Sequence, residues 1–212
     1  FMEHYEPLLR SDWAIYRGGS ILLEGSENCR IQDCNFYNLG GNAIFFSDYN
    51  YQSSVTGCHL SQIGASGICF VGDPEAVRSP SFRYEESVAI PQIDRITGSK
   101  TENYPTECFV YDNLIHHIGL YEKQVAGVQL SMCSSITISH NSIYHTPRAG
   151  INISEGTWGG HIIEYNDVFN TVRETGDHGS LNSWGRDRFW RSNRSQMDSL
   201  VTAEPDIILL DA

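Results

Sequence analysis

A short alternation of apolar residues returns along the chain at nearly constant spacing. Its five occurrences begin at Ile21, Ile44, Ile68, Val128 and Ile151, so the steps are 23, 24, 60 and 23 residues. The longest step fits one repeat of about 24 residues plus an insertion. A second set of short apolar segments follows these at a similar distance: Cys29-Arg30-Ile31, Ser54-Val55-Thr56, Phe109-Val110-Tyr111, Ile136-Thr137-Ile138 and His161-Ile162-Ile163.

Each repeat therefore holds two or three short strands, and strands this short cannot bury an apolar face alone. Successive repeats must stack and pair edge to edge. The pattern predicts an all-β fold, a right-handed single-stranded parallel β-helix (a β-solenoid) of about six coils, with residues 1–212 forming one domain. A doubly wound α/β fold is excluded because no intervening segment carries the apolar stripe of an amphipathic helix.

Small polar or thiol residues follow the second strand in each repeat. Stacking places them in a column with neighbours about 4.8 Å apart, and we expect an inward ladder with an architectural role. Its members are Cys34, Cys58, Asn113, Asn141 and Asn166. Glycines recur before the strands, where a turn needs positive φ or a close backbone approach. They include Gly18, Gly19, Gly40, Gly41, Gly64, Gly67, Gly119, Gly127 and Gly150.

The insertion covers residues 71–107 and contains four prolines and mixed charges. Such a composition is typical of a loop, here one long loop that projects from a turn of the solenoid. Long loops on a repeat scaffold commonly build the binding face. The six cysteines match neither a CxxC pair nor a compact disulfide framework, so we expect mainly buried free thiols.

Composition narrows the partners. The chain has 212 residues, 40% of them hydrophobic, and 14 Lys and Arg against 26 Asp and Glu give a net charge of −12. This balance argues against nucleic acid or an anionic membrane surface as partner. No segment is apolar enough for a membrane span, and no signal peptide opens the chain. The abrupt ends predict a piece cut from a longer protein, with any targeting signal outside it.

A polar, tryptophan-rich region at 175–198 departs from the plain repeat, together with the segment around Trp158. Pyranose rings offer apolar faces to tryptophan and hydroxyls to polar side chains, so this composition suits a sugar site. The expected substrate-binding residues are Trp184, Trp158, His178, Arg186, Arg188 and Asn182, with Trp190 a further platform. Burial of the tryptophans under the long loop is the alternative.

Glycosidic cleavage needs two carboxyl groups, and the candidates are Asp187 and Asp177, with Glu155 third. Residues of one column lie about 5 Å apart on adjacent coils and about 10 Å apart across one coil, near the retaining and inverting separations. Glu24, Asp48 and Asp73 follow first strands and are weaker candidates. Each carboxylate is alternatively a solvated turn residue.

Other chemistries find no support. The histidines His116, His117, His140 and His145 have no defensible metal-ligand spacing and are expected to be structural. No metal site and no cofactor are predicted, and calcium is not indicated. Neither a G-x-S-x-G elbow nor a phosphate-binding glycine loop is present in the sequence.

The strings Thr175-Gly176-Asp177-His178-Gly179 and Asn182-Ser183-Trp184-Gly185-Arg186-Asp187 give the chain a resemblance. Residues 17–190 resemble bacterial right-handed parallel β-helix repeat proteins, and among enzymes glycoside hydrolase family 141. That resemblance implies action on plant polysaccharides through paired aspartates, with Asp187 or Asp177 supplying one carboxyl. The second acid is then expected beyond Ala212.

The resulting hypothesis is a secreted or cell-surface (extracellular or periplasmic) glycoside hydrolase whose partner is a polysaccharide or oligosaccharide. A polysaccharide lyase is a second enzyme reading, because five arginines between 173 and 194 could line a groove for uronates. A non-catalytic glycan-binding solenoid is the third. The sugar, the linkage and the oligomeric state stay open.

Overall fold

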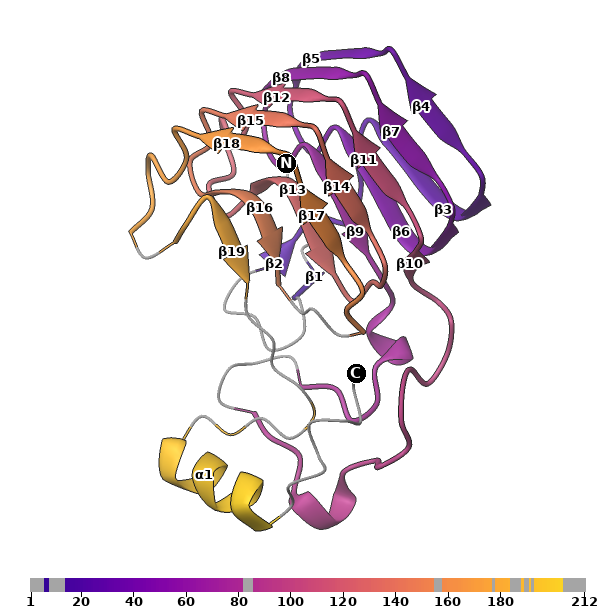
Figure 1. The fold of residues 1–212 in the computed structure, drawn as a ribbon, viewed down its shortest axis with the longest axis vertical. Coiled ribbons are helices and arrows are strands. Elements are labelled where there is room, and N and C mark those ends of the chain that lie inside the picture. Colours follow the sequence, from indigo (N-terminus) through magenta and orange to yellow (C-terminus); the bar gives the residue numbers. More distant parts are fainter. Residues whose placement is uncertain are drawn as a thin grey trace.

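The structure is a computed structural model, and it describes residues 6–7, 14–81, 86–154, 158–176, 178–183, 188, 191 and 193–203. Short parallel strands stack into three sheets that wrap around one core, which confirms the predicted parallel β-helix (Figure 1). Five coils are complete, and one further strand begins a sixth. An antiparallel pair, sheet A, precedes them and joins β1 (Glu6–Pro7) to β2 (Ala14–Ile15).

The three parallel sheets are here called B, C and D. Sheet B contains β3 (Ile21–Glu27), β6 (Ile44–Tyr51), β9 (Ile68–Val71), β10 (Pro105–Thr106), β13 (Ala126–Ser131), β16 (Ala149–Ile153) and β19 (Leu181–Ser183). Sheet C contains β4 (Arg30–Gln32), β7 (Ser54–Thr56), β11 (Phe109–Tyr111), β14 (Thr137–Ser139) and β17 (Ile162–Glu164). Sheet D contains β5 (Asn35–Leu39), β8 (His59–Ile63), β12 (Leu114–His116), β15 (Ser142–Tyr144) and β18 (Asp167–Phe169).

The register of sheet B is the one the sequence predicts, since Ile21, Ile44, Ile68, Val128 and Ile151 pair in series. In sheet C the strands of three coils begin one residue later than predicted. The physical reason is that Cys29, Ile136 and His161 stand before their strands at an inward corner position.

Single residues in the left-handed conformation make the corners of the coils. One column precedes sheet C, one precedes sheet D and one ends sheet D, each with φ between 49° and 72°. Asn, Asp, Gln and His predominate there because their side chains tolerate this conformation better than β-branched ones do. The columns are Asn28, Gln52, Glu107, Ser135 and Gly160; Asp33, Gly57, Asp112, His140 and Tyr165; Asn38, Gln62, His117, His145 and Asn170.

Several of the predicted glycines allow a close backbone approach, one of the two roles expected for them. A Cβ on Gly67 would lie 2.5 Å from the carbonyl oxygen of Gly127, and a Cβ on Gly127 would lie 2.7 Å from that of Gly150. These three glycines therefore permit close approach of neighbouring coils. Gly119, with φ of 66°, is a predicted glycine that does occupy a left-handed turn.

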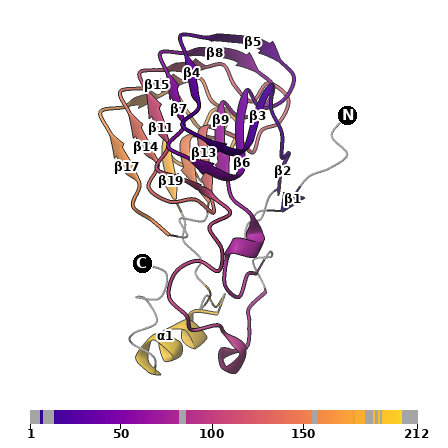
Figure 2. The same cartoon turned by 90° about the vertical axis from the view of Figure 1, so that its right-hand side faces the viewer.

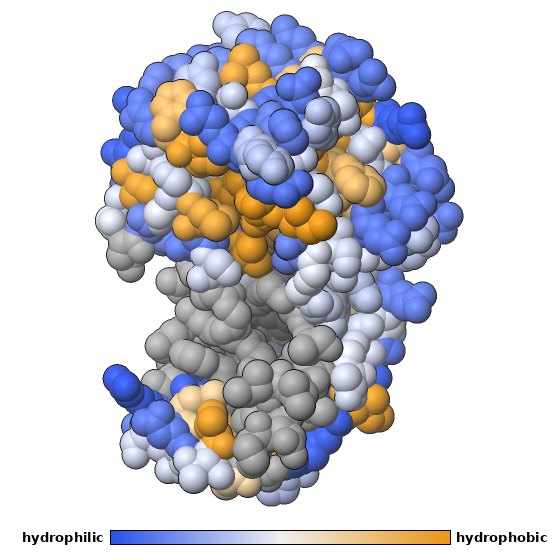
Figure 3. Space-filling model, in the orientation of Figure 1, coloured by the Kyte–Doolittle hydropathy of each residue, from blue (hydrophilic) through white to orange (hydrophobic). Residues whose placement is uncertain are grey.

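The core is continuous through the coils. Phe46 and Phe70 stack with ring centroids 4.5 Å apart and planes inclined by 7°, and both are fully buried. Ile153, Ile163 and Val168 of the last complete coil are only partly buried, and apolar surface gathers over that coil in Figure 3. Burial of apolar side chains between the sheets is the main stabilising term of this fold.

The asparagine ladder is confirmed as architecture. Asn141 Oδ1 accepts hydrogen bonds from the backbone N–H and the Nδ2 of Asn113, at 3.0 and 2.9 Å. Its own Nδ2 donates to the carbonyl of Val110, at 3.0 Å, and to Asn166 Oδ1, at 2.9 Å. Cys58 continues the column and donates its backbone N–H to Asn113 Oδ1. All six cysteines are free, and four are buried, but Cys34 is exposed.

The insertion leaves the solenoid at a break in sheet B. Strand β6 is paired over Ile44–Ser47 by β9 and over Asn50–Tyr51 by β10, so the two short strands together replace one long strand. The residues skipped include Asp48, which has φ of 55°. Between β9 and β10 the insertion holds two 3₁₀ turns, η1 (Pro74–Ala76) and η2 (Ile90–Gln92).

A helix that the sequence analysis does not foresee, α1 (Arg194–Ala203), packs against the insertion below the coils (Figures 1 and 2). Leu200 of α1 and Ile93 of the insertion are the buried members of a small apolar cluster. The repeat therefore does not continue through residues 194–203, in contrast to the expectation that it runs to the end of the chain.

Candidate functional site

The predicted sugar site is described only in part. The three catalytic candidates, Asp187, Asp177 and Glu155, lie outside the described residues, as do Trp184, Arg186 and Trp190. The described members are Trp158, His178, Asn182 and Arg188.

Trp158 and Arg188 both contact the insertion. The Trp158 ring stacks on Tyr104, with centroids 4.0 Å apart, and packs against the apolar cluster on the outside of sheet B. Arg188 is 4% exposed, and its Nη1 donates to the carbonyls of Asp94 and Ile96 at 2.7 and 2.8 Å. This arrangement fixes the insertion and does not leave the Arg188 guanidinium open to a sugar hydroxyl.

His178 and Asn182 lie in separate hydrogen-bond networks. A ring nitrogen of His178, Nδ1, is 3.1 Å from the hydroxyl of Thr175. Asn182 Nδ2 donates to Asn152 Oδ1, at 2.9 Å, and Asn152 Nδ2 donates in turn to Gln129 Oε1, at 2.8 Å. Asn152 and Gln129 are fully buried, so this row on sheet B acts as a second amide ladder.

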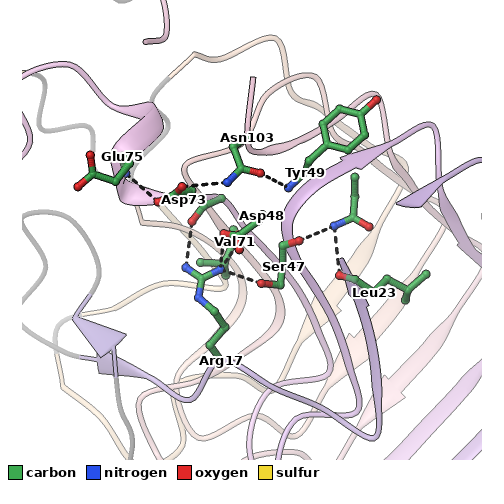
Figure 4. Close-up of polar contacts among 11 residues, drawn as sticks. Arg17, Leu23, Ser47, Asp48, Tyr49, Val71, Asp73, Glu75 and Asn103 are labelled. Carbon is green, nitrogen blue, oxygen red and sulfur yellow. Dashed lines mark hydrogen bonds and ion pairs between the residues drawn. The ribbon is translucent and has the colours of Figure 1, made fainter. Parts of the chain in front are cut away.

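Two of the carboxylates that follow the first strands, Asp48 and Asp73, are engaged in structural contacts (Figure 4). Arg17 Nη1 lies 3.2 Å from Asp48 Oδ1 and 3.0 Å from the carbonyl of Val71. Asp73 accepts from the backbone N–H of Glu75 at the start of η1 and from Asn103 Nδ2, both at 2.9 Å. Asp48 and Asp73 therefore fasten the chain before sheet B and the insertion to the solenoid.

An open groove lies on the outer face of sheet C. It encloses about 510 Å³, and exposed Phe109 and Tyr111 stand in it with the exposed guanidinium of Arg30. Amides and hydroxyls complete its lining. The lining residues are Asn28, Arg30, Gln32, Gln52, Ser54, Thr56, Phe109, Tyr111, Thr137 and Ser139.

The neighbours of the two aromatic rings are small. Phe109 pairs with Ser54 on one side and Thr137 on the other. Tyr111 pairs with Thr56 and Ser139 in the same way, although the ring of His140 approaches it obliquely, at 5.1 Å and 52°. Small neighbours leave space beside an aromatic ring that is about one strand spacing deep, roughly 5 Å on each side.

A tyrosine–carboxylate cluster borders this groove at the corner between sheets B and C. Glu27 pairs with Tyr51 in one direction, and Glu107 follows Thr106, which pairs with Tyr51 in the other direction. Glu27 and Glu107 are thus two strand spacings apart along the stack, or about 10 Å. Glu107 Oε2 accepts a 2.8 Å hydrogen bond from Gln52, a lining residue of the groove.

The carboxylates of this cluster change the acidity of both tyrosines. A 2.5 Å hydrogen bond from the Tyr49 hydroxyl to Glu27 Oε1 raises the pKa of Tyr49 to about 12. A hydrogen bond to Glu107 raises the pKa of Tyr51. Both carboxylates therefore accept hydrogen bonds from neutral phenols at neutral pH.

The sequence analysis missed the groove, although the coil alignment contains its signal. In that alignment Phe109 and Tyr111 occupy outward positions, and serine or threonine occupies the same columns in the coils on either side. Large exposed aromatics between small polar residues have no role in a solenoid core. These strands contain neither a tryptophan nor a cluster of charges, the features that indicate a sugar site in the sequence.

The described residues lack two further features. They contain no group of three or more His, Cys, Asp or Glu side chains placed to hold a metal ion. Within the same part of the chain, no helix has the length and apolar character needed to cross a membrane. No protein-family model, curated protein or solved structure matches the chain.

Proposed function

We propose that this protein binds a neutral glycan on the outer face of sheet C. The observation that carries the proposal is the pair of exposed aromatics, Phe109 and Tyr111, flanked in register by serine and threonine. An aromatic face with free space beside it accepts the apolar C–H face of a pyranose, and the surrounding amides and hydroxyls match its hydroxyl groups.

The charge around the groove favours a neutral ligand. Arg30 is the cationic residue among the residues that line it, and the corner beside it bears Glu27 and Glu107. A polymer of uronates would meet these carboxylates and a chain of net charge −12, and would be repelled. This balance also weakens the lyase hypothesis, since a lyase needs cationic groups to neutralise the uronate.

Glycan binding is tested by affinity electrophoresis and calorimetry of the full chain against soluble neutral and uronate polysaccharides. We expect binding to at least one neutral polymer and weaker binding of that polymer in Phe109→Ala. Tyr144→Ala, which removes an aromatic from the outer face of sheet D, is the matched control and retains affinity. Equal affinity of Phe109→Ala and the native chain for every bound polymer would contradict the proposal.

Glycoside hydrolysis is a second candidate, favoured by the spacing of Glu27 and Glu107. The backbone positions of the two residues lie about 10 Å apart along the stack, which is compatible with carboxyl groups held at the separation of inverting enzymes. Asp187 and Asp177, the carboxyls indicated by the sequence, are the competing choice of catalytic acids.

A reducing-end assay on the bound polymer separates these choices. Loss of hydrolysis in Glu27→Gln and Glu107→Gln supports the groove pair, whereas loss in Asp187→Asn or Asp177→Asn supports the sequence assignment. An ultraviolet-absorbing unsaturated product would identify a lyase. Binding without any product would leave glycan binding alone as the function.

A further inference from the structure

Four histidine rings form a continuous chain on the outside of sheet D. His59 Nε2 lies 2.8 Å from His116 Nε2, and His116 Nδ1 lies 2.7 Å from His117 Nδ1. His117 Nε2 then lies 2.9 Å from His145 Nδ1. The two middle rings therefore use both of their nitrogens in contacts to other rings.

The number of protons that the four histidines can accept follows from the way their rings are connected. Each nitrogen–nitrogen contact needs one hydrogen and one lone pair, and a neutral imidazole has one N–H and one lone pair. Four neutral rings satisfy all three contacts in only two ways, with every N–H pointing along the chain in one direction or every N–H pointing in the other. The tautomer of one ring thus fixes the tautomers of all four.

A single added proton also fits this chain. If His116 is protonated, it donates to both neighbouring rings. The neutral rings then take the tautomers that leave one hydrogen in each contact. A second proton does not fit. With any two of the rings charged, the four rings together bring at least four N–H groups to three contacts, so two hydrogens must face each other in at least one of them.

The residues around the four histidines do not compensate for a second positive charge. Burial, followed by the neighbouring histidines, lowers the pKa of His116, and burial, His145 and the cationic Arg173 lower that of His117. Ser61 and Tyr144 flank His116 in register, and the Tyr144 ring stacks on it at 4.9 Å. Neither is a carboxylate that could neutralise a second positive charge.

We propose that these four histidines form a pH-sensitive contact between neighbouring coils. The contact accommodates one added proton, and it breaks when a second proton binds. His117 and His145 are the corner residues at which two neighbouring coils leave sheet D. The turn after His117 contains Gly119, Leu120 and Tyr121, whose N–H groups donate to carbonyls of the preceding coil. Separation of the two corners in mild acid exposes this turn.

Hydrogen exchange of the full chain at about pH 7.5 and about pH 5.5 tests the proposal, because histidine changes charge between these values. After correction for intrinsic rates, we expect the amides of residues 117–124 and of His145, Thr146 and Arg148 to lose about tenfold in protection at the lower pH. In a His161→Asn background, which removes the acid sensitivity of the buried histidine beside sheet C, amides of β11 and β14 keep theirs. Unchanged protection of both turns would overturn the proposal.

His117→Gln is the decisive variant, because Gln62 occupies the equivalent corner of a neighbouring coil with φ of 56°. We expect the acid-induced loss of protection to fall below about twofold. His140→Gln, at a corner before sheet D where its ring contacts only Tyr111 and Tyr165 among the described rings, is the matched control. A native-like acid response in His117→Gln contradicts the proposal.

Nitrogen NMR of the imidazoles in the native chain gives an answer that does not depend on any variant folding. We expect the four rings to take up one proton together between about pH 7.5 and about pH 5.5. Four independent titrations, each complete in that range, would overturn the proposal.

Discussion

The outer faces of sheets C and D share one backbone plan but differ in how their aromatic residues are spaced. On sheet D, His116, Tyr144 and Phe169 occupy consecutive coils, and each ring stacks on the next at 4.9 Å. On sheet C, Phe109 and Tyr111 stand between serines and threonines. The rings of sheet D cover each other's faces, whereas those of sheet C leave space beside them.

This difference shows how a solenoid separates stability from recognition. Cross-strand aromatic pairs stabilise a sheet, but a ring face that is already covered cannot take a ligand. A single aromatic between small residues contributes less to the sheet and keeps its face accessible. The spacing of aromatics along a column, more than their number, then indicates which face binds.

The largest expected effect comes from the ladder that lies under both faces. Asn141→Ala removes five hydrogen bonds of the buried amide and leaves the Asn113 N–H groups without their acceptor. We expect a loss of about 3 kcal/mol in unfolding free energy, measured by urea denaturation. Asn35→Ala, at an exposed position of β5, is the control, and an equal effect of the two would refute the ladder's role.

The buried His161 beside sheet C should make the unfolding free energy depend on pH. His161, which precedes β17 of sheet C, has its pKa lowered to about 4 by burial, so the folded state resists a proton that the unfolded chain accepts. Stability is therefore complete above pH 6.5 and declines as the pH falls toward 4, by at most about 3 kcal/mol. His161→Asn should remove this part of the slope of unfolding free energy against pH, and an unaltered slope would contradict the assignment.

The open rings of sheet C should dominate glycan affinity. Phe109→Ala is expected to weaken binding about tenfold, equivalent to about 1.4 kcal/mol. Phe169→Ala on sheet D removes a ring of the same kind from the stacked column and should change the dissociation constant less than about twofold. Calorimetric titration of both variants decides whether the spacing of the rings matters.

The smallest expected effect comes from a substitution that gives sheet C consecutive aromatic rings like those of sheet D. Thr137→Phe places a ring beside Phe109, where stacking should raise the unfolding free energy by about 0.5 kcal/mol. The same ring fills the space that we assign to sugar, so glycan affinity should fall. A variant that is more stable and binds as well as the native chain would show that the space is not used.

Much of the fold was predictable because a solenoid repeats its chemistry. The apolar alternation set the register of sheet B, and the column of Asn113, Asn141 and Asn166 predicted the ladder. The corners were harder to foresee, because His117 or Gln62 in the left-handed conformation looks no different in sequence from a strand residue. Helix α1 is short and mostly exposed, with Leu200 as its buried residue, and so gives little apolar pattern to detect.

The candidate site was less predictable than the fold. Trp158 and Arg188 carry the chemistry of sugar recognition, yet both contact the insertion, a long-range pairing that spacing along the chain does not encode. The groove on sheet C exists because only small residues, Ser54 and Thr137, lie beside Phe109. This arrangement becomes visible only when the coils are aligned in three dimensions. The roles of Asp187, Asp177 and Glu155 stay predictions.

The junction at which β9 and β10 together replace one long strand has a consequence for protein engineering. Both ends of the insertion pair with β6, on either side of Asp48 and Tyr49, so we expect the coil to close with a much shorter segment between them as well. The junction is therefore a site at which we expect one inserted segment to be replaceable by another. New loops could be grafted there while the groove on sheet C, carried by other strands, keeps its shape.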